Sequence, residues 1–340
     1  MSGTIAVTGG TGVIGTHCCR RLLNEGWTVR GLCREHSDRT PHETSVSWIE
    51  GDLLEQPDVL ADLVDGVDAV LHLAGIGLDA APPRVVRRVN VEGTRAVLEA
   101  CQDHAVDRLV FVSTAGTRGA AGTVPADESD MATPVGAYQQ SKATAELLVD
   151  RYARTDGDAV TVHPTSVFGP GDTSFTEPLM AMATEWYWPV HLPGGINIVG
   201  LSDVIDGVLA ALRAGQRGEH YILGGENISY GEAIRRIAEV VGGRPATHEV
   251  PASVIRAAGP VAAVAGRLTG RRIFPYSRSM ARLATESLFY SDEKARSELE
   301  YTTRPLEDHV PAVADWLEGQ SPAQAVSDGQ PAPAQALTRR

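Results

Sequence analysis

A tyrosine and a lysine four residues apart, Tyr138 and Lys142 of AYQQSKATAE, form the pair of side chains with the clearest chemical use in this sequence. The spacing predicts that both lie on one face of a helix, one turn apart. A lysine ammonium beside a phenol lowers the pKa of the phenol, so the tyrosine can act as a base toward a carbinol or an acid toward a ketone. Thr114 of VFVSTAG stands at the expected end of a strand, where its hydroxyl can bond the reacting oxygen.

A tyrosine and a lysine with this spacing are common in proteins, so the spacing alone does not indicate a catalytic site. The composition of the chain supplies further evidence. The 30 basic residues comprise 28 Arg and only two Lys, Lys142 and Lys294. Because one of the two lysines occupies this place, we interpret the pair as an acid/base site.

A glycine-rich turn predicts a dinucleotide site at the start of the chain. In TIAVTGGTGVIGTH the glycines follow a strand-like run directly and open a helical one. Glycine lets the backbone turn tightly and lets a pyrophosphate come close, and the helix N-terminus offers free N–H donors. We expect the cofactor to contact Gly9, Gly10, Thr11, Gly12, Val13, Ile14 and Gly15.

The end of the second strand predicts which dinucleotide binds. In VRGLCRE, Cys33 and Arg34 stand where NAD-binding units usually carry Asp or Glu for the ribose 2′-hydroxyl. An arginine pairs with a 2′-phosphate, which favours NADP over NAD. In the alternative, Arg34 is a solvated charge and Glu35 takes the role of the acid. The other cofactor contacts predicted are Asp52, Leu53, Leu73, Ala74, Gly75, Pro164 and Val167, together with Tyr138 and Lys142.

The elements that must position these residues alternate along positions 4–165. Short buried-strand runs (TIAVT, TVRGLC, VSWIEG, DAVLHLAG, RLVFVST, AVTVHP) are separated by helical patterns. This alternation predicts an α/β fold with a doubly wound parallel sheet, the Rossmann fold. We expect a Rossmann domain over 1–174, to which some later segments return, a smaller helix-rich substrate domain over 175–318, and a disordered tail over 319–340.

Charge and composition exclude several classes of protein. With 43 acidic against 30 basic residues the net charge is −13, which argues against a nucleic-acid partner. The chain has no apolar stretch of the ~18–20 residues that a membrane span needs and no signal peptide, which predicts a cytoplasmic protein without integral membrane association. The acidic, lysine-poor composition suits an acidic proteome or a GC-rich genome.

Cysteine and histidine spacing gives no reason to expect a metal. The chain has no CxxC and no HExxH, so we expect the four cysteines to be buried thiols: Cys18, Cys19, Cys33 and Cys101.

The motifs TGGTGVIG, GDL, HLAG, VNVEGT, VSTAGT, YQQSK and HPTSVFGPGD together resemble the extended short-chain dehydrogenase/reductase superfamily, in its NAD-dependent epimerase/dehydratase group. The resemblance covers about residues 4–317. It implies bound NAD(P) and a catalytic set of Thr114, Tyr138 and Lys142, with Asn90 of VNVEGT as a structural and proton-relay residue. It also implies a homodimer through the helices that contain Asn90 and Tyr138.

The second half of the chain looks most like hopanoid-associated sugar epimerases and dihydroflavonol reductase-like members. Two positions depart from the pattern of the group. His163 replaces the usual Arg before a Pro, and Gly200 replaces a usual His or Tyr.

Three functions follow: an oxidoreductase acting at a carbinol or ketone carbon of a small molecule, a nucleotide-sugar epimerase or dehydratase, and a non-catalytic NAD(P)H-binding subunit of a larger complex. Residues 155–212 contain no Lys or Arg to hold a diphosphate, which favours the first function. The segment instead suits an apolar substrate, unless its large side chains are packing residues: Phe168, Phe175, Met180, Met182, Trp186, Tyr187 and Trp188. The phosphate ligands left to an epimerase are Arg272, Arg278 and Arg282.

Overall fold

A parallel sheet forms the centre of the protein. The computed structural model describes residues 3–39, 44–78, 80–119, 124–130, 133–155, 157–184, 190–269 and 278–319. Within these ranges the sheet has seven strands in the order β10-β6-β5-β4-β1-β2-β3, and all neighbours are parallel. The strands are β1 (Thr4–Thr8), β2 (Thr28–Cys33), β3 (Ser47–Glu50), β4 (Ala69–His72), β5 (Arg108–Val112), β6 (Ala159–Pro164) and β10 (His220–Leu223).

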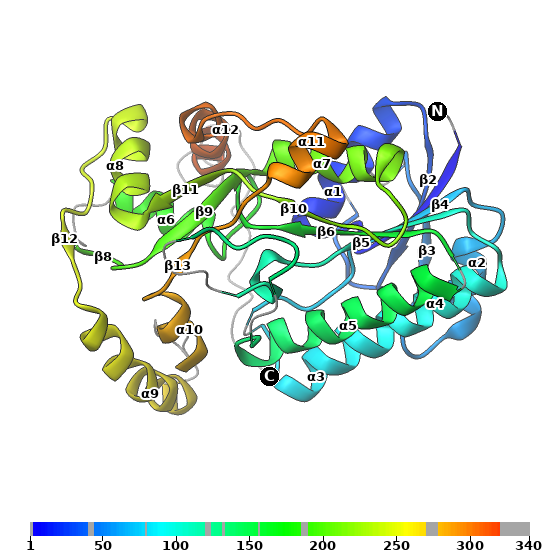
Figure 1. Ribbon diagram of the computed structural model, residues 1–340, viewed down its shortest axis with the longest axis horizontal. Helices are drawn as coiled ribbons and strands as arrows, with labels where there is room; N and C mark the ends of the chain where they lie inside the picture. Colours follow the sequence, from blue (N-terminus) through cyan, green and yellow to red (C-terminus); the bar gives the residue numbers. More distant parts are fainter. Residues whose placement is uncertain are drawn as a thin grey trace, which may run out of the picture.

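Helices cover both faces of this sheet (Figure 1). One face carries α1 (Val13–Asn24), α7 (Leu201–Ala214) and α11 (Glu293–Leu299). The other carries α2 (Pro57–Val64), α3 (Pro83–Arg87), α4 (Gly93–Asp103) and α5 (Gly136–Thr155). Strands covered on both faces are apolar along their whole length, which explains the continuous runs in the sequence. The predicted doubly wound Rossmann fold is confirmed.

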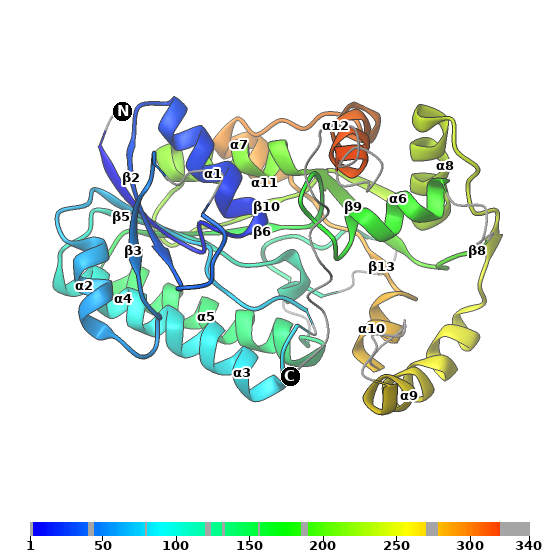
Figure 2. The ribbon, with the colours of Figure 1, turned by 180° about the vertical axis from the view of Figure 1, so that it is seen from behind.

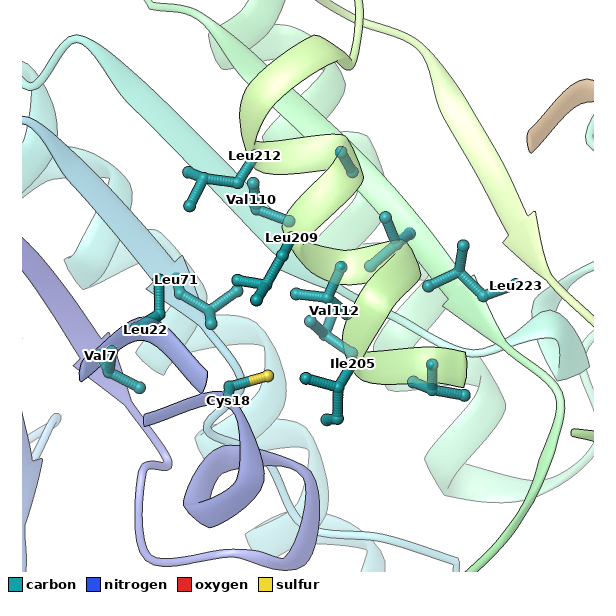
Figure 3. Packing of buried hydrophobic residues seen from close by; sticks show 14 of the residues in the cluster. Val7, Cys18, Leu22, Leu71, Val110, Val112, Ile205, Leu209, Leu212 and Leu223 are labelled. Carbon is teal, nitrogen blue, oxygen red and sulfur yellow. The ribbon is translucent and has the colours of Figure 1, made fainter. Parts of the chain in front are cut away.

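Figure 3 shows the packing of α1 and α7 on the first face of the sheet. Leu22 of α1 and Leu209 of α7 meet Leu71 and Val110 of the strands, and all four side chains are at most 1% exposed. Each side chain buried to this degree contributes about 1.5–3 kcal/mol. This packing fixes α1, and with it the glycine-rich turn, at the carboxyl ends of β1 and β4.

The helical pattern over 85–104 is interrupted in the structure. The chain forms α3, then one π-helical turn, η2 (Arg88–Glu92), and then α4. A π turn inserts an extra residue into the helix and is often found at functional sites. Here the turn carries Asn90, which is 1% exposed.

A smaller region lies beyond the edge of the main sheet (Figure 2). Its sheet, within the described residues, has the order β11-β9-β13 with β7 also paired to β9, and a separate pair is formed by β8 and β12. The strands are β7 (Ser166–Phe168), β8 (Val190–His191), β9 (Gly195–Gly200), β11 (Glu226–Ser229), β12 (His248–Glu249) and β13 (Ser287–Leu288). The helices are α6 (Thr176–Thr184), α8 (Tyr230–Val241), α9 (Ala252–Thr269), α10 (Arg278–Leu283) and α12 (Leu306–Gly319).

Strand β10 differs from the sequence-based expectation. The run EHYIL is expected as an isolated strand of the smaller region, but β10 is the edge strand of the main sheet beside β6. Tyr221, Ile222 and Leu223 of β10 are fully buried there, which explains why this late segment returns to the first sheet. Residues 320–340, most of the predicted tail, lie outside the described residues.

The predicted buried thiols are confirmed, since all four cysteines are free and buried. Among the described helices, none combines the length and the apolar character needed to cross a membrane.

Candidate active site

The glycine-rich turn joins β1 to α1, as predicted, and leaves no room for side chains. Gly9 has a φ of +73°, and a Cβ there would lie 2.6 Å from the Ala74 nitrogen. A Cβ on Gly15 would lie 2.1 Å from the Gly9 carbonyl oxygen. Gly12 is the N-cap of α1 and no side chain caps it, so the first N–H groups of the helix are available to an anion. The cradle therefore fits the pyrophosphate of a dinucleotide.

Other predicted cofactor residues lie just after β3, at the end of β6 and in β7. Asp52, after β3, accepts a hydrogen bond from the Leu54 nitrogen (2.8 Å) through Oδ1. Leu53 packs against the core beneath α2 and α4. Pro164 ends β6, and Val167 of β7 packs against the core formed with α1 and α7. A Cβ on Gly171, just after β7, would lie 3.6 Å from Val13, so this later turn contacts the start of α1.

His72, the first residue of the HLAG motif, links the ends of β1 and β4. Its Nδ1 lies 2.6 Å from the Thr8 hydroxyl and its Nε2 lies 2.9 Å from the Thr94 hydroxyl. The Ala74 nitrogen donates to the same Thr8 hydroxyl (3.3 Å). Burial lowers the pKa of His72 to about 3, so the ring is neutral and serves as a hydrogen-bonding bridge that shapes the Leu73–Gly75 segment.

The three predicted catalytic side chains come together at the carboxyl end of β5. Thr114 is the second residue after this strand, and α5 carries Tyr138 and Lys142. Burial raises the pKa of Tyr138 above its usual range, and a hydrogen bond with the Thr114 side chain opposes this rise. The shared bond places the threonine and tyrosine hydroxyls where both can reach one substrate oxygen.

The electrostatic effect expected of Lys142 differs in the structure. Its ammonium donates to the Val112 carbonyl oxygen (2.8 Å) and lies over the Phe111 ring, 4.7 Å from the centroid. The lowered pKa expected for Tyr138 is not seen in this arrangement, because burial dominates and raises the pKa of the phenol. Burial also lowers the pKa of Lys142 to about 8, against the charge of Glu146, which raises it.

Asn90 joins the cofactor segment to the catalytic helix. Its Oδ1 accepts from the Ile76 nitrogen (2.7 Å), and its Nδ2 donates to the Ile76 carbonyl (3.0 Å) and to the Ser141 hydroxyl (2.9 Å). Ser141 donates in turn to the Tyr138 carbonyl (2.7 Å). A Cβ on Gly75 would lie 3.2 Å from Asn90 Oδ1 and 3.3 Å from Lys142 Nζ, so the predicted cofactor and catalytic residues meet at Gly75.

The end of β2 brings two arginines to the predicted NADP-selective position. Cys33 is buried, whereas Arg34 and Glu35 are exposed. Sequence reasoning missed Arg39, whose Nη1 lies 3.8 Å from Cys33 Sγ and 3.4 Å from a carboxylate oxygen of Glu50. The second basic residue within the loop REHSDR was the signal that could have identified it.

Sequence reasoning also missed a buried polar cluster behind Thr114, formed by Arg118, Glu146, His163 and His220. The last three residues offer ligand atoms of kinds that bind metals, within 4.8 Å of one another. Glu146 lies one helical turn after Lys142, which was the only local signal for it.

The large side chains expected to line an apolar substrate site divide into two groups. Phe168 and Met180 are core residues, 0% and 3% exposed, and Phe175 and Met182 pack against the same core. These four are therefore packing residues of the apolar core to which α6 and β9 contribute. Trp186, Tyr187, Trp188 and Arg272 lie outside the described residues, as does the side chain of Arg278.

The departure at Gly200 has a structural explanation. A Cβ there would lie 2.1 Å from Cε1 of His309, so the ring of His309 from α12 fills the space. Its Nε2 lies 3.1 Å from Oδ2 of Asp203 at the start of α7.

The chain is similar to known proteins in both sequence and structure. The model of the NAD dependent epimerase/dehydratase family matches residues 5–224. A putative dihydroflavonol 4-reductase from Synechocystis sp. is 31% identical over 254 residues, 71% of this chain and 74% of that protein. A 4-hydroxy-2-methyl-3-oxo-4-farnesyl-3,4-dihydroquinoline-1-oxide ketoreductase from Stigmatella aurantiaca is 30% identical over 313 residues, 88% of this chain and 91% of that protein.

A UDP-glucose 4-epimerase from Streptomyces lividans is also similar, with 29% identity over 320 residues, 84% of this chain and 95% of that protein. Among solved structures, the crystal structure of gox2253 matches with a TM-score of 0.81 and 32% identity, covering 94% of this chain and 98% of that chain.

Proposed function

This chain belongs to the NAD dependent epimerase/dehydratase family, and from that premise we propose that it is an NADPH-dependent reductase of apolar ketones. The observation that carries the choice is the absence of Lys and Arg from residues 155–212. This segment includes β6, β7, α6 and β9, which lead from the catalytic strand ends into the smaller region. A diphosphate is held mainly by arginine pairs, and a ketone needs none. The similarity to a ketoreductase along most of both chains supports the same choice.

The residues that act on the ketone are those at the carboxyl end of β5. Thr114 and Tyr138 donate hydrogen bonds to the carbonyl oxygen and polarise it. As the carbon accepts a hydride, the oxygen takes the proton of the Tyr138 hydroxyl and becomes a carbinol. Lys142, when protonated, stabilises the phenolate that forms, and Asn90 keeps Tyr138 and the Gly75 segment in register through Ser141 and Ile76. A nicotinamide dinucleotide supplies the hydride when bound.

The cofactor we propose is NADPH, held by the glycine cradle and by arginines at the end of β2. Arg34 is exposed there and Arg39 lies beside Cys33, so two guanidinium groups are in reach of a 2′-phosphate. The proposed role of Arg39 requires it to leave Glu50, an exposed partner 3.4 Å away, which costs little at a solvated position.

We also propose a cytoplasmic homodimer that pairs through the helices near the site. Leu147 on α5 is 62% exposed and Val85 on α3 is 44% exposed, and an interface through these helices would cover both. Size-exclusion chromatography with light scattering tests the oligomeric state, because a monomer at micromolar concentration would contradict it.

One assay separates the proposed function from its alternatives. The protein is incubated with stoichiometric NADPH and a panel of apolar ketones and UDP-sugars, and the absorbance of reduced nicotinamide is followed. We expect consumption of NADPH with a ketone only, because an epimerase regenerates its cofactor in every cycle. Interconversion of UDP-sugars without net consumption would support the epimerase, for which the relative from Streptomyces lividans is the supporting observation. NADPH binding without any turnover would support the non-catalytic subunit.

A further inference from the structure

The cluster behind Thr114 contains an ion pair that is almost completely withdrawn from water. Arg118 Nη2 donates to Glu146 Oε2 (2.8 Å), and the two side chains are only 10% and 6% exposed. Burying a guanidinium and a carboxylate costs free energy that their attraction rarely exceeds, so such a pair is weak support for a purely stabilising role. The role of this ion pair is better explained by the segments that Arg118 and Glu146 hold in place.

Glu146 connects the helix of the site to the segment that bears Thr114. It lies on α5, one turn after Lys142, and its Oε1 accepts a hydrogen bond from the Ser113 hydroxyl. Ser113 directly precedes Thr114 in the chain. The carboxylate therefore clamps the end of β5 to the helix that carries Tyr138 and Lys142.

His163 forms a second connection to the same segment through its Nδ1. Burial and the charge of Arg118 hold the pKa of His163 well below its usual range, so the ring is neutral. Its Nδ1 lies 3.3 Å from the Thr114 carbonyl oxygen, which can only accept, so the ring proton is on Nδ1. The unprotonated Nε2 faces Arg118 Nη2 (3.2 Å) and His220 Nδ1 (2.9 Å).

Arg118 also occupies the position that a metal ion would take in this cluster. Its Nη2 lies 2.8 Å from Glu146 Oε2, 3.2 Å from His163 Nε2 and 3.0 Å from His220 Nδ1. The three side chains that offer metal-ligand atoms thus already surround a cation. His220 is held from its other side by Asp150, at 2.8 Å from Nε2.

We infer that Arg118 is a positioning residue for the reaction, which with Glu146 and His163 fixes Thr114 against the helix that carries Tyr138 and Lys142. Arg118 touches none of the reacting atoms and acts through Ser113 and the Thr114 carbonyl. The inference rests on the proposed function only in that both use the same three side chains. Loss of the clamp lets Thr114 move relative to Tyr138, and a displacement near 1 Å costs up to about 100-fold in rate.

The main test is a variant that replaces both charged groups by apolar side chains, Arg118→Met with Glu146→Leu, because it removes the hydrogen bond to Ser113 and leaves no unpaired charge in the core. We expect kcat to fall about 10- to 100-fold, while the KM for NADPH and the Tm stay close to those of the wild type. The single variant Arg118→Ala should lower kcat similarly and lower the Tm as well, since it leaves Glu146 buried without its cation.

The matched control is Arg108→Ala, at the other end of strand β5. Arg108 pairs with Asp158 (2.7 Å) in a partly buried ion pair, so its loss should lower the Tm without changing kcat. Wild-type kcat in the double variant would overturn the inference, because the pair would then contribute stability only. Loss of kcat and NADPH binding together would also overturn it, since the pair would then hold the whole fold.

Two further results separate this inference from the proposed function. If the wild type turns over UDP-sugars and no ketone, the proposed reductase function fails, and the same variants are compared on the epimerase reaction. Binding of one equivalent of Zn²⁺ by the wild type in calorimetry would overturn the inference, because the cluster would then be a metal site. We expect no such binding.

Discussion

Replacement of Tyr138 by Phe removes one hydroxyl from the site and tests the proposed acid. The ring keeps its packing on α5, and only the proton donor and its hydrogen bond with Thr114 are lost. General acid–base catalysis contributes about 10²–10⁴ in rate, which corresponds to about 3–5 kcal/mol of activation free energy. The lost hydrogen bond also costs about 1 kcal/mol of folding stability. This cost is separate from the activation free energy and smaller than it.

The assay for this variant is NADPH consumption at saturating ketone, together with fluorescence titration of NADPH. We expect kcat to fall by about a hundredfold or more, and the Kd of NADPH to stay nearly unchanged because the glycine cradle is untouched. Tyr152→Phe is the matched control on the same helix, 14 residues further on and about 21 Å away along the axis. Near-normal turnover of Tyr138→Phe, or an equal loss in Tyr152→Phe, would refute the assignment.

Three other predictions concern the cofactor and the pH dependence. Arg34→Ala and Arg39→Ala should each weaken NADPH binding by about 1–3 kcal/mol and hardly change NADH binding. If titration shows that the parent protein binds NADH more tightly than NADPH, the proposed selectivity is contradicted. Burial lowers the pKa of Lys142 to about 8, so its charge is present below that pH and lost above it, and kcat for ketone reduction should decline from about pH 8 upward. A decline in the pH profile that begins only near pH 10 would contradict this prediction. Gly15→Ala should abolish measurable NADPH binding and lower the Tm, because the new Cβ would overlap the Gly9 carbonyl oxygen; a calorimetric Kd within a few-fold of the parent would count against the cradle.

Local patterns in the sequence were enough to predict the sheet and the cofactor turn. Strand runs such as TIAVT and RLVFVST are apolar along their length because each strand is covered on both faces, and neighbouring residues alone reveal this. The glycine turn and the spacing of Tyr138 and Lys142 are equally local, since one spans a single strand–helix junction and the other a single helical turn.

Tertiary structure decided everything that depends on partners far apart in the chain. Strand β10, with three of its four residues fully buried, joins β6 across more than fifty residues. The polar cluster draws Arg118 from the segment after β5, Glu146 from α5, His163 from β6 and His220 from β10. No neighbouring residue predicts such contacts, because the free energy that selects them comes from burial and pairing between segments that meet only in the folded chain. The same reason applies to Lys142. Its spacing from Tyr138 is set by the helix, but the direction of its ammonium and the raised pKa of the phenol follow from the carbonyl of Val112 and the depth of the site.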